Sequence, residues 1–337
     1  MTADVELEIP AIYYGGVERI VQGLIKEYLD KGNEVILVAH TNEHLDPRVR
    51  AYPWKNHSSR GMKNILENSL FLLRVVLKNR PQVIHSFSRL MFLYPVFLFT
   101  QIRVVQSYGR FISKNSTRIG KRIGGNKLQL TSCAHHMLSH LPNKNHWKVI
   151  ANFVDLDKFT YKEQALGNYL VFIGRIEDIK GTREAIEVAV QSGIPLLIAG
   201  NINDDQMDYF ENEIKPYEQH PLISLIGPVD DVQKNEILGK ARAAILPFKL
   251  KQEAFGLTII ESMATGTPVI SFNIAAVPEI IEHNKSGFIC NSIQEMKEAV
   301  KRIDDIPREL VRKSVEERFA SAIISEQYLQ LFNEIQR

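Results

Sequence analysis

The chain has 337 residues, of which 45% are apolar and 24% charged, a globular composition whose length suggests two domains. Cys133 and Cys290 have neither metal nor disulfide spacing, which excludes a disulfide-rich scaffold and favours a reducing compartment. Residues 1–10 lack the parts of a signal peptide, and the longest apolar run, residues 90–102, is too short to span a membrane, so we expect a soluble protein.

The net charge of +2 conceals an uneven distribution. Residues 1–150 contain 21 lysines and arginines and 10 acids, whereas the remainder contains 20 and 29. Residues 51–150 hold 16 basic residues and one acid, Glu67. Such a field attracts anionic surfaces or acceptors. No nucleic-acid motif accompanies it, so an anionic lipid or lipid-phosphate acceptor is favoured over nucleic acid.

Residues 70–80 combine leucines and valines with Arg74, Lys78 and Arg80. This pattern is typical of a basic amphipathic helix at a membrane surface. The alternative is an ordinary packing helix whose basic residues face water. The sequence leaves both interpretations open.

The N-terminal half alternates short apolar segments with helical patterns. Residues 5–9 alternate apolar and acidic side chains, a helix is expected over 17–30, and a strand over 34–39. Further strands are expected over 83–86, 103–109 and 128–132, and a helix over 134–141. In doubly wound folds, ligands bind where such strands end.

Gly15 and Gly16 open the first helix, where free amides and a partial positive charge can hold an anion. A tight loop is the alternative. His135, His136 and His140 lie close together but do not match a zinc motif, and we expect no metal. His85 ends a strand and is interpreted as structural or solvated.

The C-terminal half predicts a second α/β domain. Residues 169–173 form a buried strand that ends in Gly174 and Arg175, and Lys180 precedes a helix over 182–192. Strands over 195–199, 223–226 and 243–247 follow, alternating with helices, and a helix over 321–335 closes the chain. The domain junction is expected near Asn152.

The most informative stretch is residues 245–282. A strand over 243–247 leads into a loop, a helix begins near Leu257 or Thr258 and ends at Gly266, and a second, parallel strand covers 269–272. Gly256 has no side chain to block an approaching anion. The amides of Gly256, Leu257 and Thr258 are therefore candidates to hold a phosphate.

Two glutamates flank this anion site. Glu253 lies before the helix and Glu261 lies about one turn inside it. One carboxylate can accept hydrogen bonds from sugar hydroxyls and the other from ribose hydroxyls, which suits the two ends of a nucleotide sugar. For an isolated pair of glutamates, solvated surface positions are the alternative.

The run from Glu253 through Phe255-Gly256-Leu257 to Glu261, with Gly266-Thr267-Pro268-Val269 after it, resembles the E-x7-E signature of glycosyltransferase family 4. Its members are retaining, metal-independent enzymes of GT-B fold. The resemblance implies two doubly wound, Rossmann-like α/β domains facing a central cleft. Residues 1–151 would form the acceptor-side domain, residues 152–315 the nucleotide-sugar domain, and residues 316–337 a helix that returns to the N-terminal domain.

The resemblance also assigns roles to residues. Glu253 would bind the donor sugar and Glu261 the ribose, while Arg175 and Lys180 would hold the donor diphosphate and offset the charge on the leaving nucleotide. The catalytic set is Glu253, Arg175 and Lys180. The remaining donor-binding candidates are Gly15, Gly16, Tyr108, Gly174, Val229, Phe255, Gly256, Leu257 and Thr258.

Two features depart from the family pattern. In the family, one strand commonly ends in His-Gly, and its histidine lies near the reaction centre. Here that strand ends in Tyr108-Gly109. Either the tyrosine substitutes as a hydroxyl contact, or catalysis is altered or absent. Only fourteen residues precede Gly15, so the first strand is expected to be short or missing. Asp155 and Asp157 spell D-x-D, which we interpret as coincidence at the domain junction.

The expected function is transfer of a sugar from a nucleotide-diphosphate sugar, a UDP-sugar favoured, to a glycan or lipid-linked acceptor in cell-envelope glycan biosynthesis. No cofactor is expected. A sucrose-phosphate or trehalose-type synthase is a close alternative, and a catalytically silent sugar-nucleotide-binding subunit is another. A nicotinamide oxidoreductase is disfavoured because no G-x-G-x-x-G follows a predicted strand. We expect a cytoplasmic location, with peripheral contact at the inner face of the membrane through the basic half as a further expectation.

Overall fold

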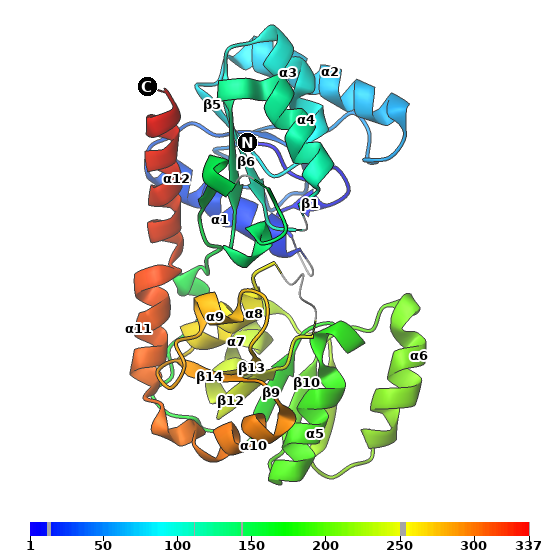
Figure 1. Ribbon diagram of the computed structural model, residues 1–337, viewed down its shortest axis with the longest axis vertical. Helices are drawn as coiled ribbons and strands as arrows, with labels where there is room; N and C mark the ends of the chain where they lie inside the picture. The colour runs from blue at the N-terminus through cyan, green and yellow to red at the C-terminus, as the bar shows by residue number, and fades with distance from the viewer. Residues whose placement is uncertain (12–14, 111, 143, 250–253, 337) are drawn as a thin grey trace. The chain divides into compact units, whose positions relative to one another are not determined.

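A computed structural model describes residues 1–336 except 12–14, 111, 143 and 250–253. The chain forms two compact units, one of Met1–Asn152 with Ser321–Arg337 and one of Phe153–Ala320 (Figure 1). Each unit is a parallel α/β structure with helices packed on its sheet. In the described part of the chain, no helix is both long enough and apolar enough to cross a lipid bilayer.

The second unit contains a six-stranded sheet in the order β11-β10-β9-β12-β13-β14, with every pair parallel. Apart from the edge strand β11, whose residues are partly exposed, its strands are apolar runs buried on both faces, which is the pattern of a sheet covered on both sides. The strands are β9 (Leu170–Ile173), β10 (Leu196–Ala199), β11 (Ile223–Gly227), β12 (Ala243–Leu246), β13 (Val269–Phe272) and β14 (Gly287–Cys290). The predicted strand, helix, strand unit around the second glutamate is therefore confirmed, with β12 and β13 parallel.

Helices of the second unit pack in two groups. α5 packs against α10, while α8 packs against α7 and α11. The helices are α5 (Thr182–Ser192), α6 (Met207–Tyr209), α7 (Asp231–Lys240), α8 (Leu257–Ala264), α9 (Val277–Ile280), α10 (Ile293–Lys301) and α11 (Arg308–Arg318).

A buried arginine joins several loops of this unit. The Arg308 guanidinium donates to the carbonyl oxygens of Lys162 at 2.8 Å, Gly239 at 2.8 Å and Ala241 at 3.0 Å, and to the Thr267 hydroxyl at 2.6 Å. Burial lowers the pKa of this guanidinium to about 10. The contacts tie the ends of α7 and α8 to the start of α11.

The first unit contains two runs of parallel strands, β4-β2 and β5-β6-β7-β8. Thr2 forms parallel bridges to Val38 on one side and Ser86 on the other, which joins the two runs into one doubly wound arrangement. The strands are β1 (Glu8–Ile9), β2 (Ile36–Val38), β3 (His40–Thr41), β4 (Arg50–Tyr52), β5 (Val83–Ser86), β6 (Arg103–Tyr108), β7 (Leu128–Ser132) and β8 (Trp147–Val149).

The beginning of the chain lies in the centre of this sheet. The Thr2 amide donates to the His85 carbonyl at 3.0 Å, and the Ala3 amide donates to the Val38 carbonyl at 3.1 Å. Only Glu8–Ile9 of the alternating segment forms a strand, paired with β3. Below Met1, between the starts of β2 and β5, a cavity of about 480 Å³ is lined by residues of both strands and of α1, α2 and α12.

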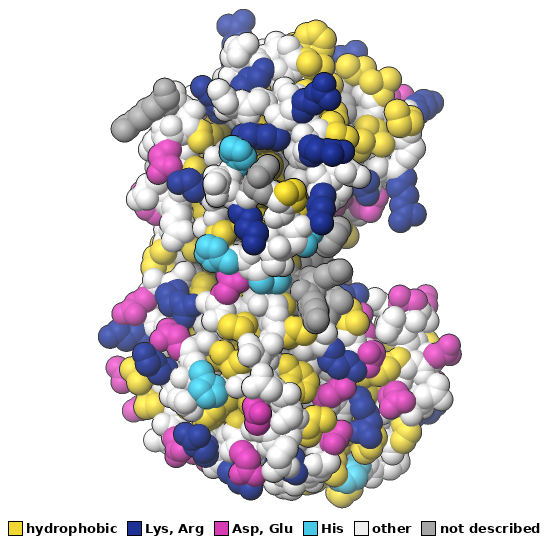
Figure 2. All heavy atoms as spheres, in the orientation of Figure 1, with side chains coloured by type: hydrophobic (Ala, Val, Ile, Leu, Met, Phe, Trp, Pro, Cys, Tyr) yellow, Lys and Arg dark blue, Asp and Glu magenta, His cyan; other side chains and the backbone are white. Residues whose placement is uncertain are grey.

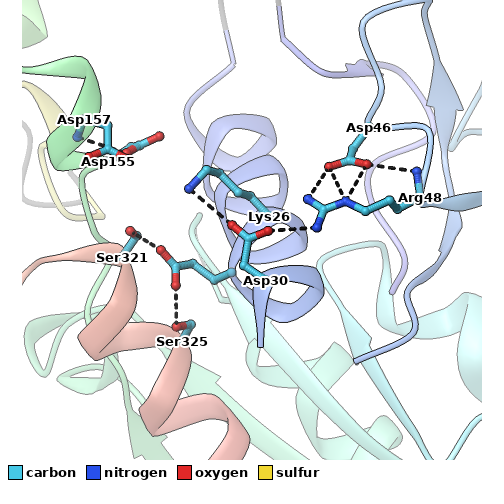
Figure 3. Close-up of polar contacts among 9 residues, drawn as sticks. Lys26, Asp30, Asp46, Arg48, Asp155, Asp157, Ser321 and Ser325 are labelled. Atoms are coloured by element: carbon cyan, nitrogen blue, oxygen red, sulfur yellow. Dashed lines mark hydrogen bonds and ion pairs between the residues drawn. The ribbon is translucent and has the colours of Figure 1, made fainter. Parts of the chain in front are cut away.

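Helices cover both faces of the sheet in the first unit. The helices are α1 (Gly16–Asp30), α2 (Met62–Asn79), α3 (Tyr94–Phe99), α4 (Lys114–Gly124) and α12 (Ser321–Gln336). Leu72, Val75 and Val76 of α2 share one apolar core with residues of α3. On the other face α12 packs against α1, where the Glu27 carboxylate accepts hydrogen bonds from Ser321 at 2.6 Å and Ser325 at 3.4 Å (Figure 3).

Lys26, Asp30, Asp46 and Arg48 form a surface network on this unit, in which Arg48 contacts Asp30 at 2.9 Å and Asp46 at 2.7 Å (Figure 3). Because these side chains are exposed, we expect the network to contribute little stability.

The predicted helix over 134–141 is wrong. This segment forms a 3₁₀ helix at His136–Leu138, and its amides bond three residues back, as Ser139 does to the His136 carbonyl at 2.9 Å. Pro142 follows directly and disfavours helical backbone at Leu141. The available length is too short for a stable α-helix before that point.

Candidate functional site

In the second unit, the order in which successive strands join the sheet changes direction between β9 and β12. From β9 the chain continues to β10 on one side, and β12 lies on the other side. From these neighbouring strands the chain thus continues to opposite sides of the sheet, and doubly wound sheets bind ligands at the carboxyl ends of two such strands. The predicted residues Gly174, Arg175 and Lys180 follow β9, and Gly256, Leu257 and Thr258 come after β12.

The two loops contact each other directly. The Lys249 amide donates to the Ile179 carbonyl at 3.0 Å. A Cβ at Gly181 would lie 2.0 Å from the Pro247 carbonyl oxygen, so only glycine permits this approach. The sheet and these contacts bring the two predicted groups of residues to one edge.

The start of α8 has the geometry of an anion site. Gly256 precedes the helix with φ 85° and ψ 65°, a left-handed conformation that favours glycine. The first hydrogen bond of this helix runs from the Ile259 amide to the Gly256 carbonyl at 2.9 Å. The amides of Leu257 and Thr258 precede this bond in the sequence. Phe255 is buried against Phe319, with ring centres 5.8 Å apart, and anchors the entry into the helix.

Arg175 and Lys180 lie in the segment after β9, at the same edge of the sheet. Arg175 Nη2 lies 2.9 Å from Glu177 Oε1, and a Cβ at Gly200 would lie 1.8 Å from the Gly174 carbonyl oxygen, which fixes the turn before Arg175. Lys180 Nζ lies 5.1 Å from the centre of the Phe248 ring. Phe248 belongs to the loop after β12, so the ring supports a cation from the loop after β9.

Glu261 is largely buried and ion-paired. Its Oε1 accepts a hydrogen bond from Lys234 Nζ at 2.9 Å, and the two side chains are 14% and 11% exposed. Lys234 also lies 3.5 Å from Asp231 Oδ1 and 5.5 Å from the centre of the Phe159 ring. The interpretation of Glu261 as a solvated surface residue is therefore wrong.

Sequence reasoning did not identify Lys234. The residue belongs to α7, whose start is set by a capping box: the Asp230 side chain accepts from the Gln233 amide at 2.8 Å. Val229 lies just before this cap. No pattern within the E-x7-E run points to a partner on another helix, so only the tertiary structure shows the pair.

The first predicted glutamate, Glu253, lies outside the described residues, and its role stays a prediction. Near it in sequence, Lys249 Nζ contacts Glu184 at 2.9 Å and also Asp178. These acids raise the pKa of Lys249 against the opposing effect of burial.

In the first unit, Gly15 and Gly16 lie at the start of α1, as predicted. Gly15 has φ 147°, and a Cβ there would lie 2.9 Å from Glu18 Oε2. Glu18 is buried, and burial raises the pKa of its carboxyl, while Arg110 Nη2 approaches Glu18 Oε1 at 3.3 Å. Gly15 thus lies directly against a buried carboxylate.

Tyr108 ends β6 and packs into the interior of the first unit. Its ring centre lies 5.6 Å from that of Trp147, and the ring contacts the apolar core under α2 and α3. Burial raises the pKa of its hydroxyl further above the ordinary tyrosine value. This environment favours a packing role for the side chain.

The acids of the D-x-D sequence and one of the clustered histidines have hydrogen-bond partners within the protein. Asp155 Oδ1 accepts from the Asp157 amide at 3.2 Å and caps a short turn (Figure 3). His140 Nε2 lies 3.0 Å from the Ile112 carbonyl oxygen. Among the residues that the structure describes, no three His, Cys, Asp or Glu side chains are grouped as a metal site.

Comparisons with known proteins agree with this architecture. Residues 154–317 match the family described as "Glycosyl transferases group 1", and residues 14–124 match the one described as "Glycosyltransferase Family 4". The whole chain superposes on the Anabaena protein HepE, solved with UDP and glucose, with a TM-score of 0.74, 15% identity, and 98% and 99% of the two chains covered. The two halves of the chain thus match models of glycosyltransferase families, and the chain has the GT-B fold.

Two curated relatives are similar to part of the chain. Glycogen synthase of Mycobacterium tuberculosis is 28% identical over 43% of the chain, and O-antigen chain mannosyltransferase C of Escherichia coli is 25% identical over 51%. These alignments cover 36% of the first relative's length and 48% of the second's. The chain therefore spans between a third and a half of the lengths of these two relatives.

Proposed function

We propose that this protein is a glycosyltransferase that moves a sugar from a nucleotide-diphosphate sugar, a UDP-sugar favoured, to a glycan or lipid-linked acceptor, with retention of configuration and without a metal or other cofactor. The observation that carries the proposal is the edge of the second unit's sheet where the neighbouring strands β9 and β12 end and the strand order changes direction. The segments at this edge supply two cations, a helix N-terminus and a paired carboxylate.

Each of these groups suits one part of the donor. The amides of Leu257 and Thr258 and the positive end of α8 would hold phosphate oxygens. Arg175 and Lys180 would bind the diphosphate and stabilise the negative charge that grows on it as the bond between the sugar and the phosphate oxygen breaks. The Arg175 guanidinium would then share its charge between Glu177 and the phosphate.

Glu261 would accept hydrogen bonds from the ribose hydroxyls. The Lys234 ammonium holds one carboxylate oxygen, which limits how the side chain can rotate. Glu253 would bind the donor sugar, and the backbone near Val229 the base. In the transfer step the acceptor oxygen bonds to the anomeric carbon, the leaving diphosphate takes the bonding pair, and a diphosphate oxygen receives the acceptor proton.

The identity of the donor and acceptor is inferred from similar proteins. HepE, which was solved with UDP and glucose, supports UDP as the nucleotide. The similarity to O-antigen chain mannosyltransferase C supports a cell-envelope glycan as the product. The basic N-terminal half is consistent with an anionic or lipid-linked acceptor.

A second candidate function is binding without catalysis. It is favoured by Tyr108, which packs against Trp147 at the position where a histidine was expected. In that case the site would still bind a nucleotide sugar, and no sugar would be released.

Calorimetric titration of uridine, guanosine and adenosine diphosphates into the protein tests the donor site. Removing a charged hydrogen-bond acceptor costs about 1.5–3 kcal/mol, so we expect Glu261→Gln to weaken binding of the preferred nucleotide by about 10–100-fold. Glu236→Gln on the exposed side of α7 is the matched control and should bind normally. Equal binding by both variants would contradict the assignment of Glu261.

A further inference from the structure

The outward face of α2 carries an apolar stripe. Met62, Leu66, Leu70 and Leu77 are exposed, with Leu66 58% and Met62 81% accessible. Their spacing places Met62, Leu66 and Leu70 on successive turns of one face. The inward face, with Leu72, Val75 and Val76, is already buried in the core. Packing within the unit therefore does not account for the outward leucines.

The stripe continues onto the neighbouring helices. α3 packs against both α2 and α4. At the end of α3, Leu98 and Phe99 are 67% and 70% exposed, and Ile119 of α4 is also exposed. Figure 2 shows hydrophobic side chains gathered over α2 and the end of α3. Large exposed apolar side chains that gather in this way mark a binding surface more often than isolated ones do.

Cations border this apolar surface. Lys63 and Arg74 are exposed on α2, and Lys114, Arg118 and Arg122 form an exposed stripe on α4, at intervals of four residues. Figure 2 shows lysine and arginine side chains around the apolar area. The only acid in the sequences of α2, α3 and α4 is Glu67. Its carboxylate lies 3.9 Å from Lys55 and accepts a hydrogen bond from Asn56 at 2.9 Å.

We propose that this surface, formed by α2, the end of α3 and α4, docks on the anionic face of a lipid bilayer. The apolar side chains would enter the boundary between headgroups and acyl chains, and the cations would contact the headgroup phosphates. Nucleic acid would bind the cations through its phosphates and leave the leucines and Phe99 exposed to water. It would therefore explain the charged residues of the surface but not the apolar ones. The membrane accounts for both.

The proposal does not depend on the donor chemistry of the second unit, because vesicle binding is read without nucleotide or sugar transfer. Flotation of the full chain is compared on vesicles of phosphatidylcholine alone and with 30% phosphatidylglycerol. We expect at least tenfold more protein on the anionic vesicles, and loss of that excess in Leu66→Glu/Leu70→Glu and in Arg118→Glu/Arg122→Glu. Thermal unfolding of each variant checks that it is folded.

Val232→Glu/Leu310→Glu is the matched control, since both side chains are exposed on the second unit. It should float as the wild type does. Equal binding to neutral and anionic vesicles would overturn the proposal. So would binding that the leucine variant leaves unchanged, because that result means attraction by charge alone. A preference for a single-stranded oligonucleotide that prevents flotation would assign the surface to nucleic acid and also overturn it.

Discussion

Replacing Lys234 by methionine is expected to destabilise the second unit, because it leaves the Glu261 carboxylate without its charge partner. The two charged atoms lie 2.9 Å apart between side chains that are 11% and 14% exposed. At an effective dielectric constant of about 20, two unit charges at this distance attract by about 6 kcal/mol before desolvation is subtracted. Breaking a fully buried pair costs about 3–5 kcal/mol, and the residual exposure reduces our expectation to about 2–3 kcal/mol.

Glu261→Gln should cost less, since Lys234 keeps Asp231 at 3.5 Å. The double variant should cost less than the sum of the two single changes, with a coupling of about 1–3 kcal/mol. Urea unfolding of the four proteins measures these free energies. Lys240→Met, which removes an exposed pair with Glu236, is the control and should stay within about 0.5 kcal/mol of wild type. Additive costs at Lys234 and Glu261 would refute the pairing.

The same change tests the role of Lys234 in the site. Without the ammonium, the Glu261 carboxylate can rotate and loses its orientation toward the ribose. We expect Lys234→Met to weaken binding of uridine diphosphate about tenfold, which corresponds to about 1.4 kcal/mol. Normal affinity in this variant, together with weak binding by Glu261→Gln, would show that Lys234 has no positioning role.

Arg308→Met should lower the free energy of unfolding by about 3–5 kcal/mol, because it leaves several buried carbonyl oxygens without donors. Urea unfolding measures this change, and Lys301→Met, at an exposed position, is the control. Glu18→Gln should match wild type in thermal melts near pH 4 and exceed it at pH 7, since a carboxyl whose pKa is raised in the folded state loses stability as pH rises through that pKa. A constant difference between the two melts would contradict this. Gly256→Ala should cost about 1–2 kcal/mol of stability through its φ of 85° and should also weaken nucleotide binding; unchanged unfolding and calorimetry would count against the strained turn.

The strands and most helices could be predicted because local signals determine them. The apolar runs at β5, β7 and β13 stand between polar or glycine-containing segments, and their predicted bounds agree with the structure. The start of α8 could be predicted from Gly256, because the left-handed backbone conformation at this position favours glycine. Such features depend on neighbours in sequence and on burial.

Contacts between residues far apart in the sequence could not be predicted from these local signals. The partner of Glu261 lies on α7, and nothing in the local sequence distinguishes Lys234 from a solvated cation on the same helix. The place of Thr2 between β2 and β5 depends on strands far away in sequence. The packing of Tyr108 against Trp147 likewise joins β6 and β8, which are not adjacent in the sheet.

The most direct test of the central claim is donor hydrolysis in the absence of acceptor. The protein is incubated with UDP-sugars and then with GDP- and ADP-sugars, nucleotide release is followed, and proton NMR records the configuration of the first free sugar. The account predicts slow release of nucleotide, a first-formed sugar with the donor's configuration, and loss of both in Arg175→Met/Lys180→Met. A sugar of opposite configuration would contradict retention. A bound nucleotide sugar that stays intact, with added glycan acceptors as well, would contradict catalysis.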